Sequence, residues 1–365
     1  MTVTNLMVCP SVANIWMRFR RFLAVGKEGT ALAWRSRGAV EKTSSLTTPP
    51  EKANSFLDRL EYAASWDFSL LRRVLPRSIR AMLHQLRVWI LARYAMFWLP
   101  RNRVFEQSRE DAAASAQLSI IVAIHDEPGV TLRCLTSLQR YAPQAEIVLV
   151  DDGSKLEETI KLIDEFAARN AWKLIRHVKA LGHSAACEAG INLATRPYLC
   201  LLNSDTVTTP WCWRPVVQVF EENPDIGVAG PSTSAGGVQT IPLAHLLRHS
   251  LNDSQICGYA RRILAQPSGG IISDLRWACG FAFFIRRSLW EQLGGFDRNL
   301  PDYGNETELC RRVRKAGYRI VWVHNSYIHH FCSMTYGKMA GDESFLRHMR
   351  FVREYIQEKH PPRDL

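Results

Sequence analysis

Residues 118–154 read LSIIVAIHDEPGVTLRCLTSLQRYAPQAEIVLVDDGS, and their pattern of apolar runs indicates the class of fold. Its two apolar runs, Leu118–Ile124 and Glu146–Val150, are short and rich in β-branched residues, as in strands that are buried on both faces of a sheet. Between them, Val130–Tyr141 has the apolar spacing of a helix. A strand, a helix and a second strand in this order predict a right-handed crossover between two parallel strands.

The same alternation continues along the chain. Further strands are expected at Lys173–His177, Tyr198–Leu202, Ile226–Ala229, Trp277–Arg286 and Arg319–Val323. Helices are expected at Leu156–Asn170, Ser184–Ala194, Trp211–Asn223, Leu243–Arg248, Glu306–Ala316 and Glu343–Glu358. Apart from the short helix near 243–248, residues 231–275 read as irregular. The pattern predicts an α/β domain built on a mainly parallel sheet.

Upstream of this domain the charge changes. Residues 1–110 hold 18 Lys and Arg against 8 Asp and Glu, a net of +10, whereas the rest of the chain has a net of only +1. The basic charge is therefore a property of an extension, which argues against a nucleic-acid partner for the main domain. Thr43–Pro50 reads as a linker, and apolar residues at helical spacing from Ile79 to Ile90 predict a helix that Pro100 ends.

These features predict three segments. Residues 1–112 are expected to form a basic, partly helical extension, residues 113–340 a catalytic domain, and residues 341–365 a C-terminal helix. The chain has nine cysteines and no CxxC pair, which suits a reducing compartment and buried cysteines that act as small apolar residues. Because no run of 18 apolar residues and no secretory signal is present, a cytoplasmic location is expected.

Polar residues follow three of the expected strands. His125-Asp126-Glu127, Asp151-Asp152 and Asn203-Ser204-Asp205 would meet at the carboxyl edge of the sheet, where open α/β sheets bind their ligands. Carboxylates gathered at one edge repel each other unless a cation or a ligand compensates them. Oxygen ligands with few Cys or His favour Mg²⁺ or Mn²⁺.

Several motifs that mark other α/β enzymes are absent from the sequence. No GxGxxG follows the first strand, no GxxxxGK[ST] occurs, and there is no GxSxG elbow. A nicotinamide-dependent oxidoreductase, a P-loop nucleotidase and an α/β-hydrolase are therefore not expected. Without a glycine cradle or a P-loop lysine, a metal ion is the expected means of neutralising a diphosphate.

Five segments together resemble one known family. They are SIIVAIHDEPGVTLRCLTSL (119–138), EIVLVDDGS (146–154), LGHSAACEAGINLA (181–194), YLCLLNSDTVTTPWCW (198–213) and LGGFDRNLPDYGNETELCRRVRKAGYRIVWV (293–323). In this order and spacing the sequence resembles the family 2 glycosyltransferases, in the branch that includes bacterial rhamnosyltransferase-like enzymes. The resemblance implies a GT-A fold, a three-layer α/β/α nucleotide-diphospho-sugar transferase domain.

The resemblance also implies a nucleotide site. Asp151 would accept a hydrogen bond from a pyrimidine base, and His125 would lie against that base. The remaining residues implied for this site are Asp126, Asp152 and Gly182. The bland alternative for Asp151 and Asp152 is that they cap the turn before the next helix.

Further residues are implied for the metal and the chemistry. Asn203 and Asp205 would be the two ends of the DxD motif, with Asp205 bound to Mg²⁺ or Mn²⁺ and His330 as a further metal or diphosphate contact. Glu306 stands where the family has its catalytic base, although Asn203 and Glu306 each replace an aspartate. The alternatives are an ordinary turn at 203–205, first-turn helix charges at Glu306 and Glu308, and structural histidines at 329–330.

The expected function is therefore that of an inverting glycosyltransferase. It would move a sugar from a UDP- or dTDP-linked donor to a glycan or lipid-linked acceptor, in cell-surface polysaccharide synthesis. Residues 231–275 with Trp277–Phe281 would shape the acceptor pocket, and the basic extension could lie on the inner membrane face. A sugar-nucleotide pyrophosphorylase-like enzyme and a non-catalytic sugar-nucleotide-binding protein are the alternatives.

Overall fold

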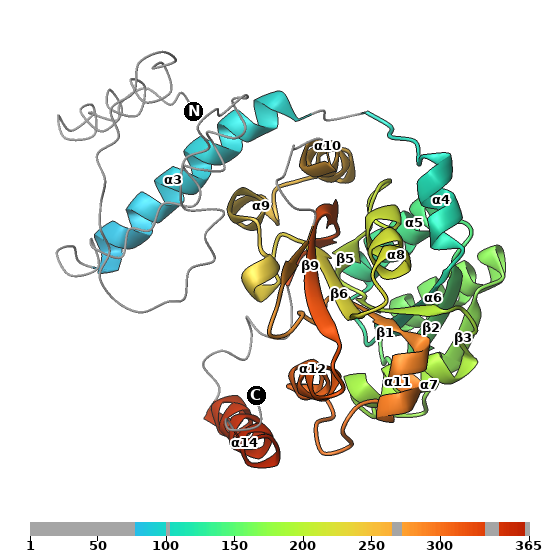
Figure 1. The fold of residues 1–365 in the computed structure, drawn as a ribbon. Coiled ribbons are helices and arrows are strands. Elements are labelled where there is room, and N and C mark those ends of the chain that lie inside the picture. The colour runs from blue at the N-terminus through green and yellow to red at the C-terminus, as the bar shows by residue number, and fades with distance from the viewer. Residues whose placement is uncertain (1–76, 100–102, 265–271, 333–342, 362–365) are drawn as a thin grey trace, which may run out of the picture. The chain divides into compact units, whose positions relative to one another are not determined.

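A computed structural model describes residues 77–99, 103–264, 272–332 and 343–361. Its centre is an eight-stranded sheet with the strand order β3-β2-β1-β4-β8-β6-β9-β7 (Figure 1). In chain order the strands are β1 (Leu118–Ile124), β2 (Glu146–Asp151), β3 (Lys173–Arg176), β4 (Tyr198–Asn203), β6 (Ile226–Ser232), β7 (Ile272–Asp274), β8 (Ala282–Arg286) and β9 (Arg319–Tyr327). A separate ribbon pairs β5 (Thr206–Val207) with β10 (His329–His330).

The sheet is mainly parallel, as expected. β1 pairs in parallel with β2 and β4, β2 pairs in parallel with β3, and β6 pairs in parallel with β9. β8 runs antiparallel between β4 and β6, and β7 pairs antiparallel with β9. The strand expected at Trp277–Arg286 is shorter than predicted, because only its second half, from Ala282 onward, joins the ladder.

Helices cover both faces of the sheet (Figure 1). One apolar core lies between the sheet and the helices α5 (Pro128–Tyr141), α6 (Glu157–Asn170) and α8 (Arg214–Glu222). The second core lies between the other face and the helices α7 (His183–Leu193), α11 (Arg287–Leu293) and α12 (Asn305–Lys315). This confirms the three-layer α/β/α architecture. All eight cysteines of the described residues are free and six are buried, consistent with their use as small apolar residues.

Three helices escaped prediction: α10 (Asp253–Leu264), α11 and α4 (Arg109–Ser115). Helix α10 lies in the region that reads as irregular, where Gly258 weakens the helical signal, and it buries Ile256, Cys257 and Tyr259. Helix α11 begins directly after β8 without a loop, so the sequence carries no turn signal between them. The short helix α9 (Pro242–Leu247) agrees with the helix predicted near 243–248, and the 3₁₀ turn η2 (Gly237–Gln239) precedes it.

The segments on either side of the sheet also form helices. Helix α3 (Arg77–Trp98) ends before Pro100, as predicted, whereas the linker expected at Thr43–Pro50 lies outside the described residues. Helix α14 (Glu343–Lys359) is the expected C-terminal helix. Within the described residues, no helix is long and apolar enough to cross a membrane.

Helix α4 (Arg109–Ser115) spans the expected boundary at 112/113. The buried Asp111 accepts hydrogen bonds from the backbone N–H groups of Trp213 (3.0 Å) and Arg214 (2.8 Å), so it caps the start of α8. Burial raises the pKa of Asp111 to about 6 despite these hydrogen bonds. Helix α4 is thus joined to the core by a buried cap, although the charge pattern assigned half of it to the extension.

Candidate functional site

The candidate site lies at the carboxyl edge of β1, β2 and β4, where the sequence gathers its polar residues. β2 and β4 end in a residue of a predicted cluster, and β1 ends one residue before His125. The parallel register aligns these ends, with Ile124 beside Asp151 and Ala123 beside Asn203. The clusters at 125–127, 151–152 and 203–205 therefore follow three adjacent strand ends. The fold confirms that these segments meet at one edge.

Asp151 does not face this edge as a free acceptor. It has no exposed surface, and its carboxylate accepts hydrogen bonds from the Ser154 N–H (2.9 Å) and from Arg176 Nε (2.7 Å). Burial opposes ionisation, but the hydrogen bonds from Ser154 and Arg176 outweigh it and lower the pKa of Asp151. In this arrangement Asp151 orders the loop that follows β2, and its contact with a base stays a prediction.

Asp152 also organises backbone. Its Oδ1 atom accepts from the Leu181 N–H (2.9 Å) and lies 2.7 Å from His177 Nδ1, while Oδ2 accepts from the Gly182 N–H (3.0 Å). Gly182 has a φ of +94°, and a Cβ atom there would lie 2.9 Å from Asp302 Oδ1. Asp152 and Gly182, both predicted for the nucleotide site, therefore contact each other, and together they set the turn that begins α7.

His125 is the most accessible residue of the predicted nucleotide site. Its side chain is 49% exposed, and Nδ1 lies 2.9 Å from the Asp152 carbonyl oxygen, which fixes the ring beside the loop. Asp126 adopts a left-handed φ of +54°, and its Oδ1 atom accepts from the N–H groups of Lys155 and Leu156, both at 2.8 Å. The accessible ring of His125 could therefore lie against a planar base, while Asp126 holds the loop at Lys155 and Leu156.

Asp205 and His330, two of the three residues predicted for the metal, lie next to each other and are called the metal pair below. The β5–β10 ribbon pairs His330 with Thr206, the residue after Asp205, and brings His330 Nε2 to 3.1 Å from Asp205 Oδ1. Both side chains remain partly accessible, at 10% and 19%. The neighbouring His329 is different, since it is fully buried between Tyr327 Oη and the Arg248 carbonyl oxygen, and burial lowers its pKa to about 3. The pair at 329–330 therefore combines one structural histidine with one that faces the site.

The geometry of this pair suits a divalent cation. His330 Nδ1 lies 2.5 Å from the Ala235 carbonyl oxygen, an interaction that assigns the N–H to Nδ1 and directs the lone pair of Nε2 toward Asp205. Burial opposes a charged imidazole, but the Asp205 carboxylate outweighs it and raises the pKa of His330. A cation between the two acceptor atoms would replace the shared proton. Among the described residues no group of three or more His, Cys, Asp or Glu could hold a metal, so a ligand would have to complete the coordination.

Asn203, the other end of the predicted motif, lies at the last position of β4. Its backbone N–H donates to the Phe281 carbonyl oxygen at 2.9 Å, and its own carbonyl oxygen accepts from Thr206 Oγ1 at 2.8 Å. Through these bonds it fixes the turn that carries Asp205. An asparagine suffices for this role, because the backbone makes both contacts.

Glu306 stands in the first turn of α12, partly buried. Burial raises the pKa of its carboxyl group, although the positive charge of His183 acts in the opposite direction. Burial alone would lower the pKa of His183, but Cys187, Glu306 and Asp302 raise it to about 9. A carboxylate with a raised pKa beside a polar edge has the character of a general base.

A short segment, Gly280–Phe281, lies between the metal pair and Glu306; it belongs to the stretch Trp277–Phe281 that was predicted to shape the acceptor pocket. A Cβ atom on Gly280 would overlap the Glu306 carboxylate, so any side chain there would displace it from its present position. The next residue, Phe281, stacks on the His330 ring with centroids 5.3 Å apart. Phe281 was predicted only as part of an acceptor pocket, and the one signal for Gly280 is a glycine inside an otherwise apolar run.

A second unpredicted contact fixes the start of α12. The buried Asn305 donates from Nδ2 to Ser184 Oγ at 2.8 Å, and its Oδ1 accepts from the Glu306 N–H at 2.9 Å. Ser184 in turn donates to the Leu300 carbonyl oxygen at 2.7 Å. The glycine-led start of α7 and the segment that carries Glu306 are therefore one hydrogen-bonded unit.

Comparison with known proteins agrees with this geometry. Residues 119–292 match the model of glycosyl transferase family 2. The chain is 24% identical over 251 residues to the probable glycosyltransferase YdaM of Bacillus subtilis (strain 168), covering 64% of this chain and 57% of that protein. It is 26% identical over 170 residues to the poly-beta-1,6-N-acetyl-D-glucosamine synthase of Staphylococcus epidermidis, covering 44% of this chain and 41% of that protein.

A solved structure is also similar, that of GalNAc-T7 with UDP, GalNAc and Mn²⁺, with a TM-score of 0.47 and 20% identity over 58% of this chain and 43% of that one. The chain spans about half the length of the two curated relatives. The family match begins in β1, ends in α11 and contains four of the five segments that carry the resemblance; the fifth, residues 293–323, lies beyond it. Residues 119–292 therefore form a domain of glycosyltransferase family 2.

Proposed function

We propose that this chain transfers a sugar from a nucleoside-diphosphate donor to a hydroxyl group of a glycan or lipid-linked acceptor, with inversion at the anomeric carbon. The observation that carries the proposal is the arrangement of Asp205–His330 and Glu306 on either side of Gly280–Phe281. One site would thereby hold both the residues that stabilise an anionic leaving group and the residue that accepts a proton. The family of the domain makes glycosyl transfer the reaction class.

The reaction divides between the two sides of the site. Glu306 takes the proton of the attacking hydroxyl as its oxygen bonds to the anomeric carbon, and the electrons of the glycosyl–phosphate bond leave with the diphosphate. Asp205 and His330 would hold a Mg²⁺ or Mn²⁺ ion, which supplies Lewis-acid stabilisation of the departing diphosphate. The raised pKa of Glu306 favours its role, because a base of higher pKa accepts the proton more readily.

The nucleotide end of the donor is assigned to the β1–β2 edge. His125 offers an accessible ring for the base, and the loops ordered by Asp126, Asp151 and Asp152 support it. A UDP- or dTDP-linked sugar is the proposed donor. The rhamnosyltransferase-like branch and the sugar itself stay predictions.

A role in cell-surface polysaccharide synthesis is proposed from the curated relatives, one of which is named as a polysaccharide synthase. The acceptor region is proposed at 231–275 with Trp277–Phe281. Trp277 is 38% exposed and lies over Gly237, where a Cβ atom would come within 3.0 Å of the indole. An exposed indole beside the site is suited to the apolar face of a sugar ring.

We further propose that α3 lies on an anionic membrane surface. Four apolar side chains at helical spacing are exposed on it: Ile79, Met82, Leu86 and Trp89. The helix contains four arginines and no acidic residue. An apolar stripe on a basic helix is the pattern of an interfacial helix, although the exposed Arg93 interrupts the stripe further along.

The experiment that tests the proposed function is donor turnover. Purified protein is mixed with UDP-N-acetylglucosamine, UDP-glucose or dTDP-rhamnose, with and without Mn²⁺, and release of UDP or dTDP is measured with water as the acceptor. Metal-dependent release from at least one donor is expected, together with a raised melting temperature for that donor. Donor binding without release would instead favour a non-catalytic sugar-nucleotide-binding protein.

A further inference from the structure

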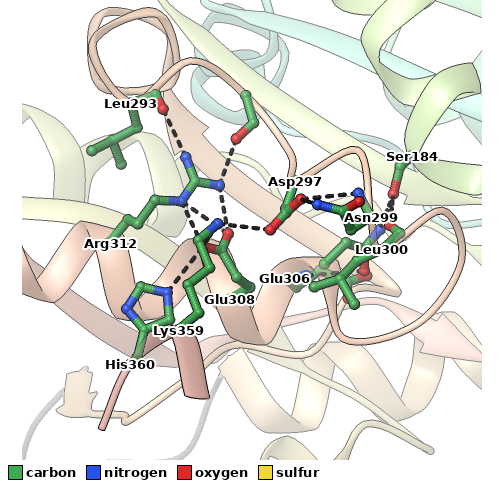
Figure 2. A network of polar contacts seen from close by, with 12 residues as sticks. Ser184, Leu293, Asp297, Asn299, Leu300, Glu306, Glu308, Arg312, Lys359 and His360 are labelled. Atoms are coloured by element: carbon green, nitrogen blue, oxygen red, sulfur yellow. Dashed lines mark hydrogen bonds and ion pairs between the residues drawn. The ribbon is translucent and has the colours of Figure 1, made fainter. Parts of the chain in front are cut away.

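Lys359, at the end of helix α14, bridges two carboxylates on opposite sides of the segment that carries Glu306 (Figure 2). Its Nζ atom lies 2.7 Å from Asp297 Oδ2 and 2.8 Å from Glu308 Oε1. Asp297 stands before the loop that leads into α12, and Glu308 stands two residues after Glu306. One side chain from the C-terminal helix therefore closes both ends of this loop.

The Glu308 end is a buried charge cluster. Glu308 has no exposed surface, and its carboxylate also lies 2.7 Å from Arg312 Nη2 and 3.0 Å from His360 Nε2. Burial opposes ionisation, but the hydrogen bonds from Arg312, Lys359 and His360 outweigh it and lower the pKa of Glu308. Because a buried carboxylate needs its partners, loss of Lys359 would leave the Glu308 charge undercompensated.

The Asp297 end is held by the same helix. Tyr355 Oη donates to Asp297 Oδ2 at 2.7 Å, and Asn299 donates from its backbone N–H to Asp297 Oδ1 at 2.9 Å. Asn299 Nδ2 also donates to Tyr355 Oη at 2.9 Å. Two side chains of α14, Tyr355 and Lys359, thus fix the first turn of the loop.

Apolar contacts seat the helix on the loop between these ends. Leu300, fully buried, forms a small core with Val352 and Ile356 of α14. Gly304, with a φ of +80°, lies so close to Val352 that a Cβ atom would overlap its side chain. The helix therefore rests against the backbone that immediately precedes Asn305 and Glu306.

The other side of the loop is bound to the catalytic domain. Leu300 accepts from Ser184 Oγ through its carbonyl oxygen, and Asn305 donates to the same hydroxyl. The loop is held between α7 on one side and α14 on the other, as Figure 2 shows around Asp297, Leu300 and Glu308. A shift of α14 would thus be transmitted to Glu306 through a continuous set of contacts.

We propose that α14 is a positioning element for the transfer reaction, with Lys359 as its positioning residue. The proposal rests on the proposed role of Glu306 as the base. Lys359 touches neither substrate nor metal in this scheme. It acts by keeping the Glu306 carboxylate in its position against Gly280. A general base displaced by about 1 Å from its productive geometry loses much of its effect on turnover.

The test compares Lys359→Ala with Lys359→Arg in the full-length chain. The matched control is Lys161→Ala, which removes an exposed ion pair on α6 in which Nζ lies 2.7 Å from Glu157 Oε1. Release of UDP or dTDP is measured with the donor that the wild type turns over. Lys359→Ala is expected to lower kcat by about tenfold or more with the donor KM within about twofold of wild type, Lys359→Arg to recover most of the loss, and Lys161→Ala to behave as wild type.

Amide hydrogen exchange of residues 297–308 gives a readout that does not depend on activity. Faster exchange there in Lys359→Ala, together with the fall in kcat, supports the positioning role. Faster exchange with unchanged kcat overturns it, because the helix would then only stabilise the fold. Should Lys359→Ala fail to fold, Tyr355→Phe removes one hydrogen bond to Asp297 and leaves the Glu308 cluster complete; unchanged kcat in that variant, despite faster exchange of 297–299, also overturns the proposal.

A failure of the proposed function is distinguishable from these outcomes. It would show in the wild type, as absence of release from every donor, before any variant is compared.

Discussion

Gly280 and the carboxylate of Glu306 are in such close contact that a single methyl group on Gly280 would overlap Oε1. The contact sets how deeply Glu306 reaches into the site. It also joins the base to the metal pair, because the residue after Gly280 stacks on His330. The consequences of this arrangement can be measured one residue at a time.

The first prediction concerns Gly280. Gly280→Ala forces the Glu306 side chain aside, so we expect kcat to fall about tenfold or more while the donor dissociation constant changes little. Gly129→Ala is the control, since a methyl group there meets nothing within 4 Å. Equal turnover in Gly280→Ala and wild type would mean that the position of Glu306 does not matter.

The second prediction concerns pH. Glu306 must be ionised to accept a proton, and burial raises its pKa, so kcat should fall as the pH drops through that raised pKa. The acid limb of the kcat–pH profile should therefore lie above the range of a solvated glutamate, about 4.3. His183→Gln removes the positive charge that opposes the shift and should move the limb to higher pH. A limb at or below pH ~4.3 would argue against Glu306 as the titrating base.

The third prediction concerns the metal pair. Asp205→Ala and His330→Ala each remove one of the two protein atoms that face the proposed cation, so donor binding should lose its dependence on Mn²⁺. Titration calorimetry of the donor with and without Mn²⁺ measures this. Asp225→Ala, a change at an exposed surface carboxylate 3.2 Å from Arg319, is the control. Full activity of the wild type in excess EDTA would exclude a metal at this site.

The fourth prediction concerns α3. Each arginine near an anionic leaflet adds about 1 kcal/mol of attraction, and the exposed apolar stripe adds to it. The full-length protein should sediment with phosphatidylserine-containing vesicles at low salt, release at high salt, and stay in solution with neutral vesicles. Met82→Gln combined with Trp89→Gln should weaken the binding without changing donor turnover. If the variant sediments as the wild type does, another part of the chain carries the binding. If the wild type does not sediment, the proposed membrane contact of α3 is excluded.

The fold could be predicted largely because its strands are locally encoded. β1, β2 and β4 are short β-branched or leucine-rich runs that end in polar residues or are followed directly by them. The ends of parallel strands meet at one edge of the sheet, whatever the loops do. Helix α10 could not be predicted in this way. Tertiary contacts bury the apolar side chains of this helix, while Gly258 lowers its intrinsic preference for a helix.

The sequence could predict which residues gather at the candidate site, but not the contacts that each of them makes. The sequence alone places both Glu306 and Glu308 in the first turn of a helix. In the fold, Glu308 is buried and paired with Arg312, Lys359 and His360. Likewise, nothing in the sequence pairs Asp151 with Arg176, 25 residues away. Such pairings depend on which strands become neighbours, and a motif does not record them.

The role of Glu306 as the base is tested by the turnover of Glu306→Gln, which preserves the shape of the side chain and removes its basicity. We expect kcat for release of UDP or dTDP in the presence of Mn²⁺ to fall by a factor on the order of 10² or more, with the donor dissociation constant nearly unchanged. Glu291→Gln makes the same chemical change at a side chain of α11 that is 64% exposed, and it should behave as wild type. Wild-type turnover by Glu306→Gln would contradict the account, because Glu306 would then be a helix-start residue without a part in the chemistry.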